Sequence, residues 1–217
     1  MVSYSEVQPY DKILGDKLTP AFARYLEEEL SYIKSAVSKD ARVLEVGCGA
    51  GRVIKELAPL VLEIVGTDHS FAQVEAADRI LNKYKNVKIV FCDGRNIPTP
   101  DAYFDLTFSA FNTFGNLCYD KFRVLLEMRR VTKGRVLLSV YGENADTYQK
   151  ELYDNIGIKS RSIGDFTLYE FPDGGNGMAE RFSERKLRRL FRDSSFSDSN
   201  IEIVRIGEFG YMCDLSI

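Results

Sequence analysis

Short apolar runs alternate with helix-like stretches from about residue 42 to residue 141, and this alternation limits the possible folds more than any other feature. The apolar runs are RVLEV, VLEIVGT, VKIVFC, FDLTFSAF and RVLLSVY, and the helix-like stretches include VIKELAPL, FAQVEAADRILNKY and DKFRVLLEMRRV. Strands that alternate with helices form parallel βα units, in which helices cover the faces of one sheet. The pattern predicts a doubly wound, Rossmann-like α/β fold with five central strands.

Both flanks add elements to this core. Residues 19–37 begin with Thr19 as a cap and Pro20 at the first helical position, and their apolar side chains recur at helical spacing, which predicts an amphipathic helix. After Tyr141, DFTLYEF and MAERFS flank a glycine-rich turn and predict a small added β-hairpin. Ser183 caps a short helix, and IEIVRIG and EFGYMCDLSI predict an antiparallel C-terminal hairpin at one edge. The expected sheet is therefore seven-stranded and mostly parallel.

The charge of the chain narrows the class of partner. Among 217 residues, 29 Lys and Arg stand against 32 Asp and Glu, and the net charge of −3 gives no general attraction to nucleic acid or anionic membranes. His69 is the single histidine, which argues against metal sites and catalytic triads built on imidazole. We therefore expect a small-molecule partner and no metal ion.

Cysteine usage and hydropathy bear on location. The four cysteines form no CxxC pair, and Cys48 and Cys92 stand in or at the end of apolar, strand-like runs. The N-terminus carries no apolar run typical of a signal peptide, and no run of about eighteen apolar residues occurs anywhere. These features predict a cytoplasmic protein with reduced thiols.

Three glycines at alternate positions follow the first strand, in VLEVGCGAGR (residues 43–52). Ligands of open parallel sheets bind beyond the carboxyl ends of the strands, and glycines let the backbone turn tightly and approach a ligand. A phosphate-binding P-loop would need Lys and Ser or Thr after Gly51, where Arg52 and Val53 stand. A dinucleotide fingerprint would need a small residue at Arg52, so NAD is disfavoured. A cradle for an adenosine-bearing molecule and an ordinary turn remain open.

Polar residues at the ends of the next three strands favour the cradle. The second strand ends at Asp68, 23 residues after Glu45, a spacing at which an acid reaches ribose hydroxyls. The third strand ends in Asp93 and Gly94, and the fourth runs into the cluster NTFGN at residues 112–116. Because these ends meet at one edge of a parallel sheet, we expect them to share a ligand.

The first of these motifs resembles that of the class I S-adenosylmethionine-dependent methyltransferases, in particular small-molecule enzymes of the methyltransferase-domain 11 and 25 kind. The resemblance covers the five-strand core well and the flanks in outline. VLEVGCGAGR resembles the family's first motif, which implies that Gly47 and Gly49 face the methionine part of the cofactor. By the same resemblance, Glu45 holds the loop and the cofactor's amino group. Two further residues of the loop are included in the implied site, Cys48 and Arg52.

The later motifs carry the same resemblance. Asp68 resembles the acid that binds both ribose hydroxyls, with His69 beside the adenine. CDGRNIP resembles the next motif, which implies that Asp93 accepts from the adenine N6 and that Gly94 contacts the base through its backbone. FSAFNTFGNL resembles the fourth strand and loop of enzymes such as the glycine N-methyltransferase group. That likeness implies that three residues lie beside the sulfonium: Ala110, Phe111 and Asn112.

Plainer structural explanations stand beside these roles. Asp68 can be a helix cap or a turn acid, Asp93 can form an Asp-Gly turn, and Asn112 can satisfy loop backbone groups. Phe111 and Phe114 can belong to the core. The basic run RFSERKLRRLFR most simply forms the solvated face of an amphipathic helix. The family's KPGG turn is reduced here to a Lys-Gly pair, and no NPPY-like sequence follows the fourth strand, which argues against methyltransferases of nucleic-acid bases.

We therefore expect a single domain that transfers methyl from S-adenosylmethionine to an O or N atom of a small molecule. In-line displacement needs alignment rather than a protein nucleophile, so no catalytic residue is named. The alternatives are a non-catalytic cofactor-binding module, an NAD-dependent oxidoreductase and an RNA methyltransferase. The expected parts are an N-terminal helical cap, a cofactor-binding core, a substrate-side insertion, and a C-terminal helix with edge strands, at residues 1–38, 40–141, 142–182 and 183–217.

The flanks 1–18 and 142–182 are expected to select the acceptor. Four tyrosines are candidates for lid or acceptor contacts: Tyr4, Tyr10, Tyr141 and Tyr211. Each can equally serve in packing. The sequence leaves the oligomeric state open.

Overall fold

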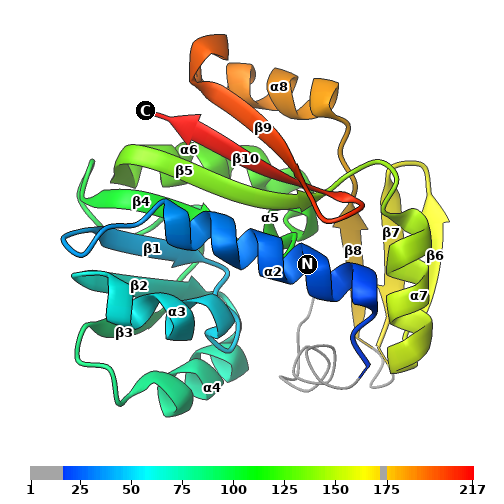
Figure 1. Ribbon diagram of the computed structural model, residues 1–217, viewed down its shortest axis with the longest axis horizontal. Coiled ribbons are helices and arrows are strands. Elements are labelled where there is room, and N and C mark those ends of the chain that lie inside the picture. Colours follow the sequence, from blue (N-terminus) through cyan, green and yellow to red (C-terminus); the bar gives the residue numbers. More distant parts are fainter. Residues whose placement is uncertain (1–16, 172–174) are drawn as a thin grey trace.

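The computed structural model describes residues 17–171 and 175–217, and its central element is a seven-stranded sheet (Figure 1). The strands, in chain order, are β1 (Arg42–Val46), β2 (Glu63–Asp68), β3 (Val87–Phe91), β4 (Phe104–Ser109), β5 (Thr132–Tyr141), β9 (Ile201–Ile206) and β10 (Gly210–Ser216). Their order in space is β3-β2-β1-β4-β5-β10-β9. Strands β1 to β5 pair in parallel, and β10 runs antiparallel to β5 and β9. The predicted fold, including its antiparallel C-terminal hairpin, is confirmed.

Helices cover both faces of this sheet, which produces two apolar layers. The helices α2 (Pro20–Ser35), α3 (Arg52–Leu57) and α4 (Phe71–Leu81) pack on one face, and α6 (Lys121–Val131) and α8 (Glu184–Asp193) pack on the other. Successive strand residues point to opposite faces, so Val43 joins the first layer and Leu44 the second. One-turn helices occur at α5 (Thr113–Asn116), η1 (Ala58–Leu60), η2 (Cys118–Asp120) and η3 (Asp198–Asn200).

Helix α2 begins where the sequence predicts. The side-chain oxygen of Thr19 accepts a hydrogen bond from the amide of Phe22 at 3.4 Å, and Pro20 occupies the first helical position. The apolar stripe of the helix buries Phe22 and Tyr25 completely against the sheet. Their rings contact Tyr141 at the end of β5, so α2 lies beside the carboxyl edge of the central strands.

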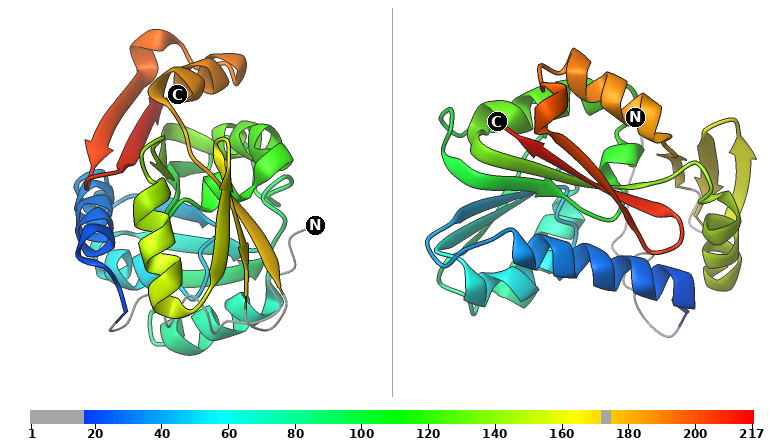
Figure 2. Two further views of the ribbon diagram at one scale, coloured as in Figure 1. Left: turned by 90° about the vertical axis from the view of Figure 1, so that its right-hand side faces the viewer. Right: turned by 45° about the horizontal axis from the view of Figure 1, so that its top comes forward.

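A second, three-stranded sheet stands at this carboxyl edge, where Figure 2 shows it together with a helix. It consists of β6 (Lys159–Ile163), β7 (Phe166–Glu170) and β8 (Asn176–Glu180), and α7 (Asp146–Ile156) precedes it. The predicted hairpin is confirmed as the antiparallel pair β7 and β8. The sequence did not reveal β6 or α7, which extend the hairpin into a layer of its own.

The basic run around α8 is mostly a solvated face, with one exception. Arg188 pairs with Glu184, and Arg189 and Arg192 are exposed beside acids of the same segment. Arg181, in contrast, is 95% buried and donates to the side chain of Asp146 at 3.0 Å and to the carbonyl of Gly164 at 2.6 Å. A solvated position for Arg181 was therefore wrong, because its guanidinium joins α7 to the small sheet.

Candidate functional site

The glycine loop between β1 and α3 forms a tight, left-handed turn. The amides of Gly47 and Cys48 both donate to the carbonyl of Thr67, at 2.8 and 2.9 Å, which fastens the loop to the end of β2. Gly47 has φ +74°, and a Cβ there would collide with the methyl group of Thr113. Gly51, at φ +84°, caps α3. Both positions favour glycine because of their left-handed conformation, and Gly47 also needs it for close approach.

Asp68 connects the glycine loop to the start of α4. One carboxylate oxygen accepts from the amide of Gly49 at 2.9 Å, and the other accepts from the amide of Ser70 at 2.9 Å. Ser70 itself caps α4, so the helix-cap explanation of Asp68 was wrong, whereas its bond to the Ser70 amide two residues on fits a turn acid. His69 is exposed, with its Nδ1 3.8 Å from the Asp68 carboxylate. The structure thus brings Asp68, His69 and the glycine loop together at one edge of the sheet.

Glu45 is a buried acid on β1 directly before the glycines. Burial of the side chain raises its pKa well above the usual range. The nearby charges of Glu29 and Asp68 raise it further, and the positive charge of Arg52 partly opposes them. Within the described residues, three buried polar atoms near this edge have no hydrogen-bond partner: Glu45 Oε2, Ser109 Oγ and Asn112 Nδ2. Unpaired buried polar atoms are costly, and a polar ligand would satisfy them.

The end of β3 gives Asp93 a local partner. Its carboxylate accepts from the Arg95 amide at 2.9 Å and from the Arg95 guanidinium at 2.6 to 3.0 Å, and this hydrogen bonding lowers the pKa of Asp93. The amide of Asn96 also bonds back to the carbonyl of Asp93. The turn-forming explanation therefore describes Asp93 in this structure. Recognition of adenine by Asp93 and Gly94 stays a prediction.

The loop after β4 adopts an unusual backbone. Ala110 is buried, and the next two residues, Phe111 and Asn112, have φ values of +52° and +55° although neither is glycine. Such conformations cost about 1–3 kcal/mol each and persist where surrounding contacts hold them. The side-chain oxygen of Asn112 accepts from the backbone amide of Tyr141 at 3.0 Å. The backbone amide of Asn112 donates to the carbonyl of Ser139 at 3.2 Å. Asn112 thus fixes its loop against β5.

A buried polar network beneath this loop was not foreseen from the sequence. Its centre is Glu29 of α2, whose carboxylate accepts from the amide of Phe111 at 2.7 Å, from the Ser139 hydroxyl and from the guanidinium of Arg52. Tyr25 donates to Ser139 at 3.1 Å. The signal that could have revealed it is spacing, because Glu29 falls on the apolar stripe of α2.

Arg52 is therefore directed toward α2. Its guanidinium pairs with Glu29 and lies over the ring of Phe111, 5.8 Å from the ring centre. The sequence assigned Arg52 to the cofactor site, and that assignment stays a prediction. Phe111 and Arg52 nevertheless join the glycine loop to the β4 loop.

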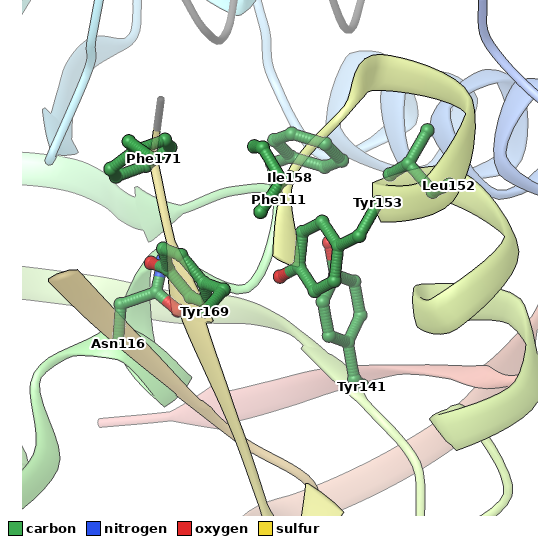
Figure 3. A pocket seen from close by; sticks show the side chains of 8 residues that line it. All are labelled: Phe111, Asn116, Tyr141, Leu152, Tyr153, Ile158, Tyr169 and Phe171. Atoms are coloured by element: carbon green, nitrogen blue, oxygen red, sulfur yellow. The ribbon is translucent and has the colours of Figure 1, made fainter. Parts of the chain in front are cut away.

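An aromatic pocket lies beside the β4 loop (Figure 3). Its cavity is small, about 20 Å³, so its walls must move apart to admit a ligand, and its described lining has five aromatic rings, two aliphatic side chains and one amide. Phe111, Asn116 and Tyr141 come from the central sheet edge. The remaining lining residues belong to α7, to the small sheet and to the chain beside them: Leu152, Tyr153, Ile158, Tyr169 and Phe171.

The tyrosines predicted to contact a lid or the acceptor have different positions in the structure. Tyr141 lines the pocket, whereas Tyr211 on β10 directs its hydroxyl to Glu143 at 3.2 Å. Tyr4 and Tyr10 lie outside the described residues. Phe114 is fully buried against Phe182 in the second core layer, so the core explanation holds for that ring.

Residues 17–171 and 175–217 contain no helix with the length and apolar character of a membrane span. No group of three or more His, Cys, Asp and Glu side chains is placed there to hold a metal ion.

A family model described as a methyltransferase domain matches residues 43–135. The ubiquinone/menaquinone biosynthesis C-methyltransferase UbiE of Burkholderia orbicola (strain MC0-3) is 34% identical over 164 residues, which are 73% of this chain and 65% of that enzyme. The chain thus spans just under two thirds of the length of this relative.

One further protein is similar in sequence over a shorter range, and another is similar in structure. A malonyl-[acyl-carrier protein] O-methyltransferase of Legionella pneumophila is 34% identical over 108 residues, 49% of this chain and 34% of that protein. A SAM-dependent methyltransferase from Aquifex aeolicus has the same fold with a TM-score of 0.65, 20% identity, and coverage of 96% of this chain and 98% of that one. The strand order, the glycine loop and these matches agree, and the chain belongs to the class I S-adenosylmethionine-dependent methyltransferases.

Proposed function

We propose that the protein transfers methyl from S-adenosylmethionine to a small, largely apolar molecule bound in the aromatic pocket. The observation that carries this proposal is the position of Phe111. Its ring lines the pocket and also lies against Arg52 of the glycine loop, so a donor on the loop and an acceptor in the pocket would be neighbours. Rings and aliphatic side chains favour a flat, uncharged acceptor.

The residues at the sheet edge fit the donor. When bound, S-adenosylmethionine supplies a methyl group on a positively charged sulfur. Glu45 would receive its amino group, because the buried carboxylate has an oxygen without a partner among the described residues. Asp68 would accept from the ribose hydroxyls while it keeps the Gly49 amide in place. The pocket would exclude water and align the acceptor, and alignment supplies most of the acceleration in such a displacement.

The acceptor atom is the finer part of the proposal. The sequence favours oxygen or nitrogen, and the relatives' names add carbon, since one is a C-methyltransferase and another an O-methyltransferase. We favour a carbon of an electron-rich ring, because the C-methyltransferase match covers more of this chain and the pocket is aromatic. We also propose a cytoplasmic location, which suits four cysteines that are all free thiols.

Two assays test the function. Calorimetry with S-adenosylhomocysteine, with NADH as the control ligand, should give micromolar binding for the former alone. Methyl-labelled S-adenosylmethionine is then offered with phenols, quinols, aromatic amines, carboxylic acids and RNA, and nuclear magnetic resonance locates the methyl group in any product. Tight binding without transfer to any of these would favour the cofactor-binding module, and binding of NADH alone would favour the oxidoreductase.

Cofactor binding should release a proton from Glu45. The raised pKa of this buried acid means that the free protein holds the proton to higher pH, whereas an ammonium beside it favours the ionised form. Affinity for S-adenosylhomocysteine should therefore rise with pH above the ordinary range of a glutamate. Calorimetry in buffers of different ionisation enthalpy counts the protons released on binding. Glu45→Gln should bind more weakly and lose this release, and equal release in both proteins would contradict the assignment.

Tyr169→Ala should impair use of the acceptor without affecting the donor. The ring of Tyr169 is buried in the pocket wall, and its loss should raise the acceptor KM about tenfold or more, because about 1.5–3 kcal/mol of apolar contact disappears. The affinity for S-adenosylhomocysteine should stay within about threefold. Tyr119→Ala is the matched control, since that ring is 96% exposed. An unchanged acceptor KM in Tyr169→Ala would exclude this pocket.

A further inference from the structure

The carboxylate of Glu29 lies where three parts of the molecule meet. It belongs to α2, it accepts from the guanidinium of Arg52 just after the glycine loop, and it accepts from the amide of Phe111 in the β4 loop. The hydroxyl of Ser139 on β5 donates to the same carboxylate. Glu29 is fully buried, so water does not replace these contacts. A helix outside the five-strand core thus supplies an acceptor to both sides of the candidate site.

The amide of Phe111 needs this acceptor. Phe111 and Asn112 form a left-handed turn without glycine, and such a turn is kept only where neighbouring groups hold it. Two hydrogen bonds hold Asn112 to β5, one through its side-chain oxygen and one through its backbone amide. The backbone amide of Phe111 donates a 2.7 Å hydrogen bond to the carboxylate of Glu29. The ring that this turn presents lines the aromatic pocket and contacts Phe22 of α2.

We propose that Glu29 is a positioning residue, which fixes the Phe111–Asn112 turn between the donor loop and the acceptor pocket. The proposal rests on the proposed function for its kinetic consequence. A buried ion pair contributes little net stability compared with apolar side chains of similar size. What an apolar pair cannot provide is an acceptor for the Phe111 amide. Loss of that acceptor should misplace the Phe111 ring, and small misplacements of aligned groups reduce turnover strongly.

Two double variants separate this role from a structural one. Glu29→Gln with Arg52→Gln removes both charges and leaves a side-chain oxygen for the Phe111 amide. Glu29→Met with Arg52→Met also removes both charges at similar volume, and it removes the Glu29 acceptor from that amide. Both variants lack Arg52 equally, so any part of Arg52 in cofactor binding cancels from the comparison. Tyr25→Phe is the control for α2, because it removes the hydroxyl bond to Ser139 and keeps every contact of the carboxylate.

Turnover and hydrogen exchange are the measurements, at a temperature where circular dichroism shows each variant to be folded. The Met variant should have a kcat about tenfold or more below the Gln variant, with affinities for S-adenosylhomocysteine within about threefold of each other. Exchange of the peptide over residues 106–117 should be faster in the Met variant than in the Gln variant. Tyr25→Phe should resemble the wild type in both measurements.

Equal kcat and equal exchange in the two double variants would overturn the proposal. A fall in kcat that follows thermal stability across all variants would likewise reduce Glu29 to a structural role. Should the Met variant not fold, Glu29→Asp replaces it, because the shorter side chain keeps the charge and withdraws from the Phe111 amide. If the wild type transfers methyl to no acceptor, the proposed function fails, and the exchange comparison alone then decides the role of Glu29.

Discussion

S-adenosylhomocysteine should bind the Asp68→Ala variant at least about thirtyfold more weakly than it binds the wild type. The loss of two interactions should produce this weaker binding. The ribose hydroxyls lose a charged acceptor, which is worth about 1.5–3 kcal/mol, and the amide of Gly49 loses the carboxylate that holds the loop at 2.9 Å. A thirtyfold change corresponds to about 2 kcal/mol. Calorimetric titration of the folded variant measures the effect directly.

Asp68→Asn and Asp154→Ala complete this experiment. The asparagine keeps one acceptor oxygen without the charge, so its affinity should fall between those of the alanine variant and the wild type. Asp154 is an exposed acid of α7 that pairs with Lys150, and its replacement should leave the affinity unchanged. Wild-type affinity in Asp68→Ala would remove Asp68 from the ligand site and leave it as a support of the loop alone.

Gly47→Ala should lose both stability and cofactor affinity, and Gly157→Ala isolates the reason. The two glycines have φ values of +74° and +75°. A Cβ at Gly157 meets no atom within 4 Å, whereas one at Gly47 collides with Thr113 at the start of α5. Gly157→Ala should therefore cost about 1–2 kcal/mol for the left-handed conformation. Gly47→Ala should cost about 1–3 kcal/mol more, because overpacking adds to the same strain.

Urea denaturation of both variants measures this difference, and calorimetry with S-adenosylhomocysteine shows its consequence. The displaced Thr113 follows the Phe111–Asn112 turn, so Gly47→Ala should weaken cofactor binding about tenfold or more, while Gly157→Ala should not. Equal free energies of unfolding in the two variants would mean that the loop yields to the extra carbon. The close contact with Thr113 would then not explain the glycine.

Local patterns predicted the main sheet well. Buried strands and capped helices can be predicted from residues adjacent in the chain. Thr19 and Ser183 cap their helices as predicted, and the glycine loop joins β1 to α3. The meeting of Asp68 with the glycine loop also followed from the sequence, since carboxyl ends of parallel strands share one edge. Strand β6 and helix α7, which extend the predicted hairpin, did not follow from the sequence. Strand β6 is polar and mostly exposed, so it shows no alternation, and pairing with β7 is what makes it a strand.

The sequence by itself therefore determined the class of fold, the glycine loop and the family, because each depends on residues close together in the chain or on a fixed rule of parallel sheets. Only the tertiary structure decided the aromatic pocket proposed for the acceptor and the network around Glu29. Phe111 lies 82 residues from Glu29 and Ser139 lies 110 residues from it. The apolar stripe of α2 marks Glu29 as a buried residue, but no sequence pattern names partners at such separations, and these contacts exist only once α2 has packed against the sheet.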